Sequence, residues 1–433
     1  MVPTAPIASH QLLLLLLQLG LLLTGAILLG RLAVRVGLPA IVGELGVGVL
    51  LGPSLFGWTL PGVSHWLFPA VPEQVHLLDA AGQLGVLLLV GLTGIELDMR
   101  MVRRQGATAV RVSLAGLVLP LGMGIALGFG LAPVLRAGDT KSVVFVLFLG
   151  VAMSVSAIPV IAKTLMDMNL IHRDIGQLTL AAGTVDDAFG WLMLSIVSAM
   201  AVGGLTGATI AFAVLSLLLV VVVAVLARPL VRAVLRRCDS PQQTTAAAAA
   251  MVVLAAAGTQ ALGLEAVFGA FVGGILVGTS GEYVRPRTAS LRMVVLTVLA
   301  PIFFATAGLR VDLRALAQPV VLGAAAAVLS VAIVSKFAGA YLGARLSRLN
   351  RWEALALGAG MNARGVVEVV VAMVGLRLGI LNSASYTIIV LVAVVTSVMA
   401  PPLLRTALKR LQETPEEEAR LHAGLATRES GGH

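Results

Sequence analysis

Two adjacent carboxylates, Asp186 and Asp187, lie near the middle of an apolar stretch from Ile175 to Val202. The stretch is long enough to cross a bilayer, whose hydrocarbon core needs ~20 apolar residues. An ionised aspartate at that depth costs at least ~2.5 kcal/mol, so it persists where a cavity, a counter-charge or a bound cation meets it. The pair therefore predicts a site inside the membrane that binds an ion, a proton or both.

The two carboxylates cannot do the same job, because successive helical residues point ~100° apart. Lys336 is the only lysine within a predicted span, and it is the natural counter-charge for one of them. Burial disfavours the charged forms of lysine and aspartate, so we expect proton exchange at this site near ambient pH. The alternative is a structural ion pair, which accounts for one aspartate and leaves the second unexplained.

A second feature is a proline inside another predicted span. The segment Met153 to Pro159 reads MSVSAIP, and Pro159 lacks the backbone N–H that a continuous helix would use. Irregular backbone at membrane depth is tolerated where it lines a cavity or is buried in protein, and freed carbonyls at half-helix ends can bind cations. We expect a broken helix here, with side-chain oxygens from Ser154 and Ser156; a simple proline kink is the alternative.

A matching break is predicted near the C-terminus, where Gly358 to Gly365 reads GAGMNARG. Asn362 is a further candidate oxygen ligand. Arg364 and Glu368 lie four residues apart on one helical face and can pair, so we assign them a structural role that neutralises the break rather than direct ion handling.

Glu44 stands alone in a glycine-rich predicted span, and gating, a dimer contact and a structural acid remain equally open for it. The six histidines and the single cysteine show no metal-ligand spacing. We therefore expect no cofactor, no metal beyond the transported ion and no catalytic residue.

The composition requires a membrane. The chain has 433 residues, of which 58% are hydrophobic and 12% charged, and its mean hydropathy of +1.01 is far above that of a soluble domain. The net charge of +9 would suggest a nucleic-acid partner in a soluble protein, but here it follows from cations at the membrane surface. We expect a lipid bilayer and no nucleic acid as partner.

Hydropathy predicts an all-α polytopic protein with about thirteen transmembrane helices, centred near residues 21, 46, 88, 118, 155, 188, 217, 252, 272, 299, 331, 365 and 393. If the N-terminus lies outside, 22 lysines and arginines fall in the cytoplasm and 5 outside. This asymmetry favours the cell membrane, with the N-terminus outside and the C-terminus cytoplasmic.

Weak internal repeats indicate two inverted halves. Val42 to Ser54 resembles Phe268 to Ser280, Gly94 to Asp98 resembles Gly308 to Asp312, and Gly150 to Met153 resembles Gly358 to Met361. Members of each pair are seven predicted helices apart, so they cross the membrane in opposite directions. The predicted plan is a transmembrane domain over 1–410, with one repeat over about 11–202, a linking helix over about 207–238, a second repeat over about 243–410 and a short cytoplasmic polar tail over 411–433.

These motifs, in this order, resemble the monovalent cation:proton antiporter-2 family of the sodium/proton antiporter superfamily. The resemblance runs over nearly the whole chain, through GELGVGVLLGPSLFGW (Gly43 to Trp58), LVGLTGIELDMR (Leu89 to Arg100), SAIPVIAKTL, TVDDAFGW, PIFFATAGLRVDL and MNARGVVEVVVA (Met361 to Ala372).

The resemblance implies two broken helices that cross near the midplane, a moving core and a dimerisation region, so we expect a homodimer. It also implies that Asp187 binds cation and proton in turn, and that Asp186 pairs with Lys336. We therefore predict a Na⁺ or K⁺/proton antiporter that works by alternating access and serves pH homeostasis. A channel-like K⁺ efflux protein and a sensor derived from a transporter are the alternatives. An intramembrane aspartyl protease is disfavoured, because its two carboxylates must face each other across a substrate.

Overall fold

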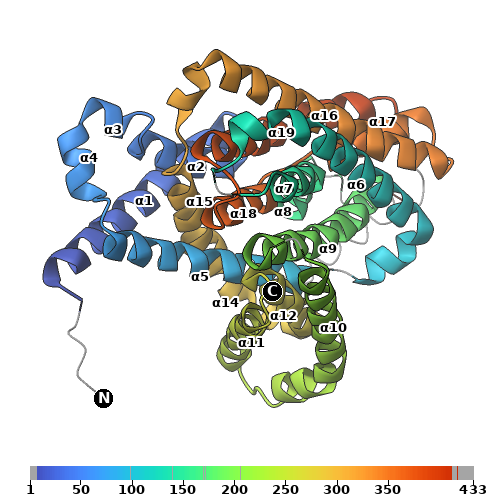
Figure 1. Ribbon diagram of the computed structural model, residues 1–433. Coiled ribbons are helices and arrows are strands. Elements are labelled where there is room, and N and C mark those ends of the chain that lie inside the picture. Colours follow the sequence, from blue (N-terminus) through green and yellow to red (C-terminus); the bar gives the residue numbers. More distant parts are fainter. Residues whose placement is uncertain are drawn as a thin grey trace. The chain divides into compact units, whose positions relative to one another are not determined.

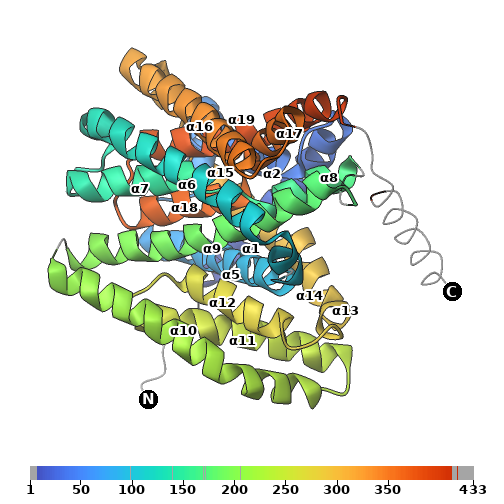
Figure 2. The ribbon, with the colours of Figure 1, turned by 90° about the vertical axis from the view of Figure 1, so that its right-hand side faces the viewer.

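The computed structural model describes residues 7–97, 99–138, 140–168, 170, 172–204, 206–411 and 417 (Figures 1 and 2). Asp98 and nearly all of the predicted polar tail lie outside the described residues. Within them, every regular element is a helix and no strand occurs. Ten of these helices are long and apolar enough to cross a membrane, and the bent pair formed by α17 (Arg351–Met361) and α18 (Val366–Arg377) makes an eleventh. The prediction of an all-α polytopic membrane protein is therefore confirmed.

The predicted count of thirteen spans is not confirmed. The predicted centres near 155 and 272 fall at the end of α7 (Ser142–Ser154) and within α12 (Ala266–Gly278). Both helices are apolar, but each has only 13 residues and is too short to cross a bilayer as a straight helix. A hydropathy average over a window of residues detects apolar composition, but it does not detect where a helix ends inside that window.

The described chain divides into two compact units, and each takes segments from both predicted repeats. The first unit comprises the described residues of 1–97, 194–322 and 373–387, and the second those of 98–193, 323–372 and 388–433. These units cut across the predicted repeat boundaries, which remain a prediction. Four helices run from one unit into the other: α9 (Asp174–Gly203), α16 (Pro319–Leu346), α18 (Val366–Arg377) and α19 (Ser383–Leu408).

The first unit contains pairs of helices that the predicted repeats relate to each other. In it α5 packs against α12, and the corresponding helices α15 and α2 pack against each other in the same way. Helices α10 and α11 run side by side in both views (Figures 1 and 2). The elements of this unit have the following bounds, besides α12: α1 Ser9–Arg35, α2 Ala40–Leu51, α3 Phe56–Thr59, α4 Pro61–Leu67, α5 Pro72–Glu96, α10 Gly207–Arg236, α11 Pro241–Ala261, α13 Val284–Arg287, α14 Ala289–Val294, a π-helix Val295–Leu299, α15 Ala300–Gly308 and a 3₁₀-helix Leu313–Ala317.

Glycines allow α2 and α15, and likewise α5 and α12, to pack closely. These glycines occupy matching positions in the two predicted repeats. A Cβ added at Gly48 would meet the backbone of Gly308, and one added at Gly274 would meet the backbone of Gly94. Gly48 matches Gly274 in the predicted repeat, and Gly94 matches Gly308. The two contacts therefore join residues that the predicted repeat pairs with each other, and the repeat remains a prediction.

The second unit holds both predicted broken helices and the aspartate pair. Its core elements are α6 (Met99–Leu135), α7, α8 (Ile158–Asp167), the part of α9 up to residue 193, α17 (Arg351–Met361) and adjoining parts of α16, α18 and α19. Helix α6 packs against α7. A Cβ at Gly339 in α16 would meet the backbone of Ala115 in α6, so these two helices also touch closely (Figure 2).

Candidate functional site

Two helix breaks lie against each other in the second unit. Helix α7 ends at Ser154 and α8 begins at Ile158, so Pro159 lies in the first turn of α8, where its missing N–H would have no helical partner. Helix α17 ends at Met361 and α18 begins at Val366. The backbone N–H of Ala157 donates to the carbonyl of Ala363 over 3.2 Å. The two non-helical stretches therefore satisfy part of each other's backbone hydrogen-bonding capacity.

Helix α17 has strong local signals at both of its ends. The Asn350 side chain accepts hydrogen bonds from the backbone N–H groups of Trp352 and Glu353, and the Glu353 carboxylate accepts one from the backbone N–H of Asn350. This reciprocal pair is a capping box, and it fixes the start of the helix. Beyond its end, Gly365 has φ 155, a conformation that is open to glycine and costly for residues with a Cβ. Gly365 therefore turns the chain from the break into α18.

Side chains at the two breaks make reciprocal contacts. Ser156 Oγ shares its single proton between the carbonyl of Met361 at 2.9 Å and Oδ2 of Asp186 at 2.8 Å. Arg364 Nη2 donates to the carbonyl of Met153 over 2.6 Å. Matching Gly150 to Gly358 places Met153 on Met361 and Ser156 on Arg364. Each side chain thus caps the half-helix that ends at the other break, and the arrangement follows the predicted two-fold relationship.

The C-terminal end of α7 is covered by two cations. Lys336 Nζ donates to the carbonyl of Ser154 over 2.5 Å, and Arg364 reaches the carbonyls of Ala152 and Met153. Positive charge is favourable at a helix C-terminus, where carbonyls lack helical donors. The sequence assigned Arg364 to the break of its own helix. The structure shows that it also neutralises the break in the other predicted repeat.

The carboxylate of Asp186 is saturated with donors. Lys336 Nζ lies 2.5 Å from Oδ2, Ser156 Oγ lies 2.8 Å from the same oxygen, and Ser113 Oγ donates to Oδ1 over 2.5 Å. Asp186, Lys336 and Ser113 are all fully buried. Asp186 is therefore held in place, and its charge is met by Lys336.

Asp187 is equally buried but has a different environment. Neither of its carboxylate oxygens has a hydrogen-bond partner of standard geometry among the described residues. The backbone of Ile158 faces it without forming such a bond, and the N-terminal end of α8 favours an ionised carboxylate there. A buried, unpartnered carboxylate is costly unless a cation or a proton neutralises it, so Asp187 can serve as the exchangeable position.

Some of the other predicted polar side chains form hydrogen bonds within the protein, and others have atoms without a partner among the described residues. Ser154 Oγ donates to the carbonyl of Val151 within its own helix. Arg364 pairs with Glu368 Oε1 at 3.3 Å. Among the described residues, the Asn362 amide oxygen and nitrogen and Glu368 Oε2 have no hydrogen-bond partner. Asn362 is thus free to turn an oxygen toward a ligand.

The buried charges around the two breaks are unequal in number among the described residues. Asp186, Asp187 and Glu368 carry one more formal negative charge than Lys336 and Arg364 supply when all five are ionised. One monovalent cation or one proton restores neutrality. Among the described residues, no group of three or more His, Cys, Asp or Glu side chains could hold a resident metal ion.

Glu44 belongs to α2 of the first unit, where it is half-buried. Sequence reasoning also missed two members of the cluster. Ser113 reaches Asp186 from α6, and Ser397 Oγ in α19 donates to the carbonyl of Arg364. A lone serine in an apolar helix usually bonds its own backbone, so neither position carries a sequence signal.

Comparison with known proteins gives consistent similarities. A sequence model of the family described as "Sodium/hydrogen exchanger, transmembrane" matches residues 20–410. The Na(+)/H(+) antiporter NhaS4 of Synechocystis sp. is 32% identical over 92% of this chain and 97% of its own length. The K(+)/H(+) antiporter 1 of Saccharomyces cerevisiae is 30% identical over 89% of this chain and 46% of its own length.

This chain spans about half the length of the yeast relative and of several Arabidopsis thaliana relatives. Among solved structures, the sodium proton antiporter MjNhaP1 of Methanocaldococcus jannaschii matches with a TM-score of 0.70. The match covers 93% of this chain and 100% of MjNhaP1 at 16% sequence identity. At that identity the similarity establishes the fold.

Proposed function

The chain belongs to the sodium/hydrogen exchanger family, and from that premise we propose that it exchanges Na⁺ or K⁺ for protons at Asp187. Members of this family are transporters, not enzymes, and the chain is a multi-pass membrane protein. Cation/proton antiport is therefore the activity class. The site, the cation and the mechanism are argued below.

One observation carries the proposal: two adjacent, fully buried aspartates have opposite environments. Asp186 has three donors, including the Lys336 ammonium, while Asp187 has none of standard geometry among the described residues. A site that binds and releases an ion in each cycle needs a carboxylate that the protein itself does not neutralise. Asp187 meets that requirement and Asp186 does not.

The proposed cycle depends on competition at Asp187. The ionised carboxylate binds the cation, with Asn362 and the Ser156 hydroxyl close to the crossing of the two breaks as further oxygen donors. A proton arriving from the other side neutralises the carboxylate and displaces the cation. Because one group holds either species, the two fluxes are coupled. Alternating access then exposes Asp187 to the two sides in turn, as in other transporters with broken helices.

The cation remains open between Na⁺ and K⁺. NhaS4 is named for sodium and the yeast relative for potassium, and both are similar to this chain to nearly the same degree. Selectivity depends on the spacing of oxygens around Asp187, which local sequence does not specify. Direct ranking of cations by transport decides the question.

We extend the proposal to topology and assembly. The excess of lysine and arginine on one set of loops supports a cell-membrane protein with its N-terminus outside and its C-terminus in the cytoplasm. A homodimer is proposed from the family resemblance. Cysteine accessibility in intact cells and cross-linking in membranes test these two points separately.

The central experiment measures cation-induced dequenching of a pH-sensitive dye in acid-loaded proteoliposomes, titrated with Na⁺, K⁺ and Li⁺. We expect a saturable response in the wild type and none in Asp187→Asn. Asp239→Asn, the same substitution at an exposed loop residue before α11, is the matched control and should transport normally.

Three outcomes overturn the proposal. Cation flux that continues without a proton gradient indicates a channel-like efflux protein. The absence of any response between about pH 6 and 9, from folded and correctly oriented protein, indicates a sensor. Normal transport by Asp187→Asn would assign antiport to a different residue.

A further inference from the structure

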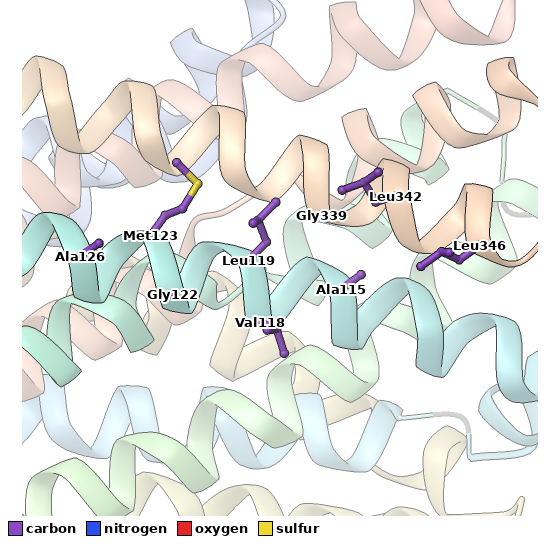
Figure 3. A pocket seen from close by; sticks show the side chains of 9 residues that line it. All are labelled: Ala115, Val118, Leu119, Gly122, Met123, Ala126, Gly339, Leu342 and Leu346. Carbon is purple, nitrogen blue, oxygen red and sulfur yellow. The ribbon is translucent and has the colours of Figure 1, made fainter.

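An apolar groove lies between α6 and α16 in the second unit (Figure 3). It has a volume of about 410 Å³. Aliphatic side chains and small residues line it. Leu119 and Met123 contribute from α6, and Leu342 and Leu346 from α16 (Figure 3).

The groove has the length of one lipid chain. Along α6 its lining runs from Ala115 to Ala126, which is about 16 Å at ~1.5 Å per helical residue. That is close to half of a ~30 Å hydrocarbon core. A single acyl chain of one leaflet therefore matches the groove in length and in polarity.

One end of the groove is basic. Arg111 lies one helical turn before Ala115 on the same stripe of α6, and it is exposed. A Cβ added at Gly343 in α16 would meet the Arg111 carbonyl, so Arg111 lies where the two helices cross. On α16, Arg345 is also exposed, and its guanidinium is oriented by a 2.7 Å bond to the carbonyl of Leu349.

We propose that this groove binds one anionic phospholipid of the surrounding bilayer, with an acyl chain between α6 and α16 and its phosphate at Arg111 and Arg345. Basic side chains at the membrane end of an interhelical groove favour anionic head groups, and arginine matches the geometry of phosphate oxygens. The acyl chain of a zwitterionic lipid also fits the apolar part of the groove, but its head group has no net negative charge to attract the two arginines.

The location has a consequence for the ion site, and this consequence rests on the proposed function. The two helices that form the groove also supply Ser113 and Lys336, which both hold Asp186. A lipid that binds α6 and α16 together stabilises the pair of helices that positions the aspartate. Lipid binding itself, however, is measured without reference to transport.

The test is native mass spectrometry of the purified full chain, with phosphatidylglycerol or phosphatidylcholine of the same acyl chains added. We expect wild type to retain phosphatidylglycerol preferentially. Arg111→Gln and Arg345→Gln should each weaken that retention about fivefold, the effect of one basic side chain on an anionic lipid. Arg232→Gln, an exposed arginine on α10, should leave it unchanged.

A groove-filling variant tests the acyl-chain site separately. A Cβ at Gly122 would meet nothing within 4 Å, so Gly122→Leu fills the groove without displacing backbone and should reduce retention of both lipids. Gly130→Leu, an exposed glycine on the same helix with equally open surroundings, is the control. Ala126→Leu, further along the groove, repeats the test if Gly122→Leu does not fold.

Equal retention of the two lipids by wild type would overturn the head-group assignment. Unchanged retention in the folded groove-filling variants would overturn the groove as the site. Neither result affects the assignment of antiport to Asp187, which is tested by ion flux in liposomes of fixed composition.

Discussion

Lys336 Nζ lies 2.5 Å from Oδ2 of Asp186, and both side chains are fully buried. The pair joins α16 of the second predicted repeat to α9 of the first. The Lys336 ammonium also donates to the carbonyl of Ser154 at the end of α7. One cation thus connects three helices directly beside Asp187, whose own carboxylate has no such support.

The two aspartates should affect stability in opposite ways. Asp186→Asn leaves the buried Lys336 charge without its carboxylate, and breaking a buried pair in this way costs ~3–5 kcal/mol. Asp187→Asn removes a carboxylate that no described residue neutralises, so its stability should equal or exceed that of wild type. Thermal unfolding in detergent with choline as the only added cation checks the order. A destabilised Asp187→Asn beside an unaffected Asp186→Asn would contradict it.

Removing both partners of the ion pair should restore stability. Replacing a buried ion pair by hydrophobic residues of similar volume is often neutral or stabilising, because no unpaired charge stays buried, and the double change here likewise leaves neither charge. Asp186→Asn combined with Lys336→Met should therefore be more stable than either single variant, with a coupling energy of ~1–3 kcal/mol. A full double-mutant cycle of thermal unfolding measures this coupling. Additive losses would mean that the two side chains act independently.

The break before α18 should depend on glycine at one position. Gly365 has φ 155, and a Cβ in this region costs ~1–3 kcal/mol, so Gly365→Ala should lower the unfolding temperature and the antiport rate together. Gly130→Ala is the control, because it is helical and a Cβ there meets nothing within 4 Å; it should be neutral or gain up to ~1 kcal/mol. Equal behaviour of the two variants would refute the role of Gly365.

Equivalent glycines in the two repeats should respond alike. A Cβ at Gly48 or Gly274 would lie within 3 Å of backbone in a neighbouring helix, so Gly48→Ala and Gly274→Ala should each cost ~1–3 kcal/mol through overpacking. Gly46→Ala, two residues earlier in α2 with nothing within 4 Å of its Cβ, should cost nothing. Comparison of the three unfolding temperatures checks the repeat. A harmless Gly274→Ala beside a damaging Gly48→Ala would contradict the equivalence.

The sequence by itself determined the features that depend on composition and local order. Apolar runs predict membrane helices because each span must satisfy its own backbone hydrogen bonds and present apolar side chains to lipid. Two aspartates and one lysine at membrane depth mark a site because burying charge is costly wherever the chain folds. The proline and the glycines near 159 and 358–365 predict breaks for equally local reasons.

Residue patterns alone did not determine which groups meet, and the pairing of Asp186 with Lys336 was expected only from the family resemblance. Helical geometry in the sequence left either aspartate able to face Lys336, because the rotation of one helix about its axis relative to another is not encoded in a local pattern. The same rotation brought Ser113 and Ser397 into the cluster and carried Arg364 to the end of α7. The break after α7 likewise depends on a backbone contact with the other break, where the N–H of Ala157 donates to the carbonyl of Ala363. These contacts join residues far apart in the chain, so their energies exist only once the helices have packed.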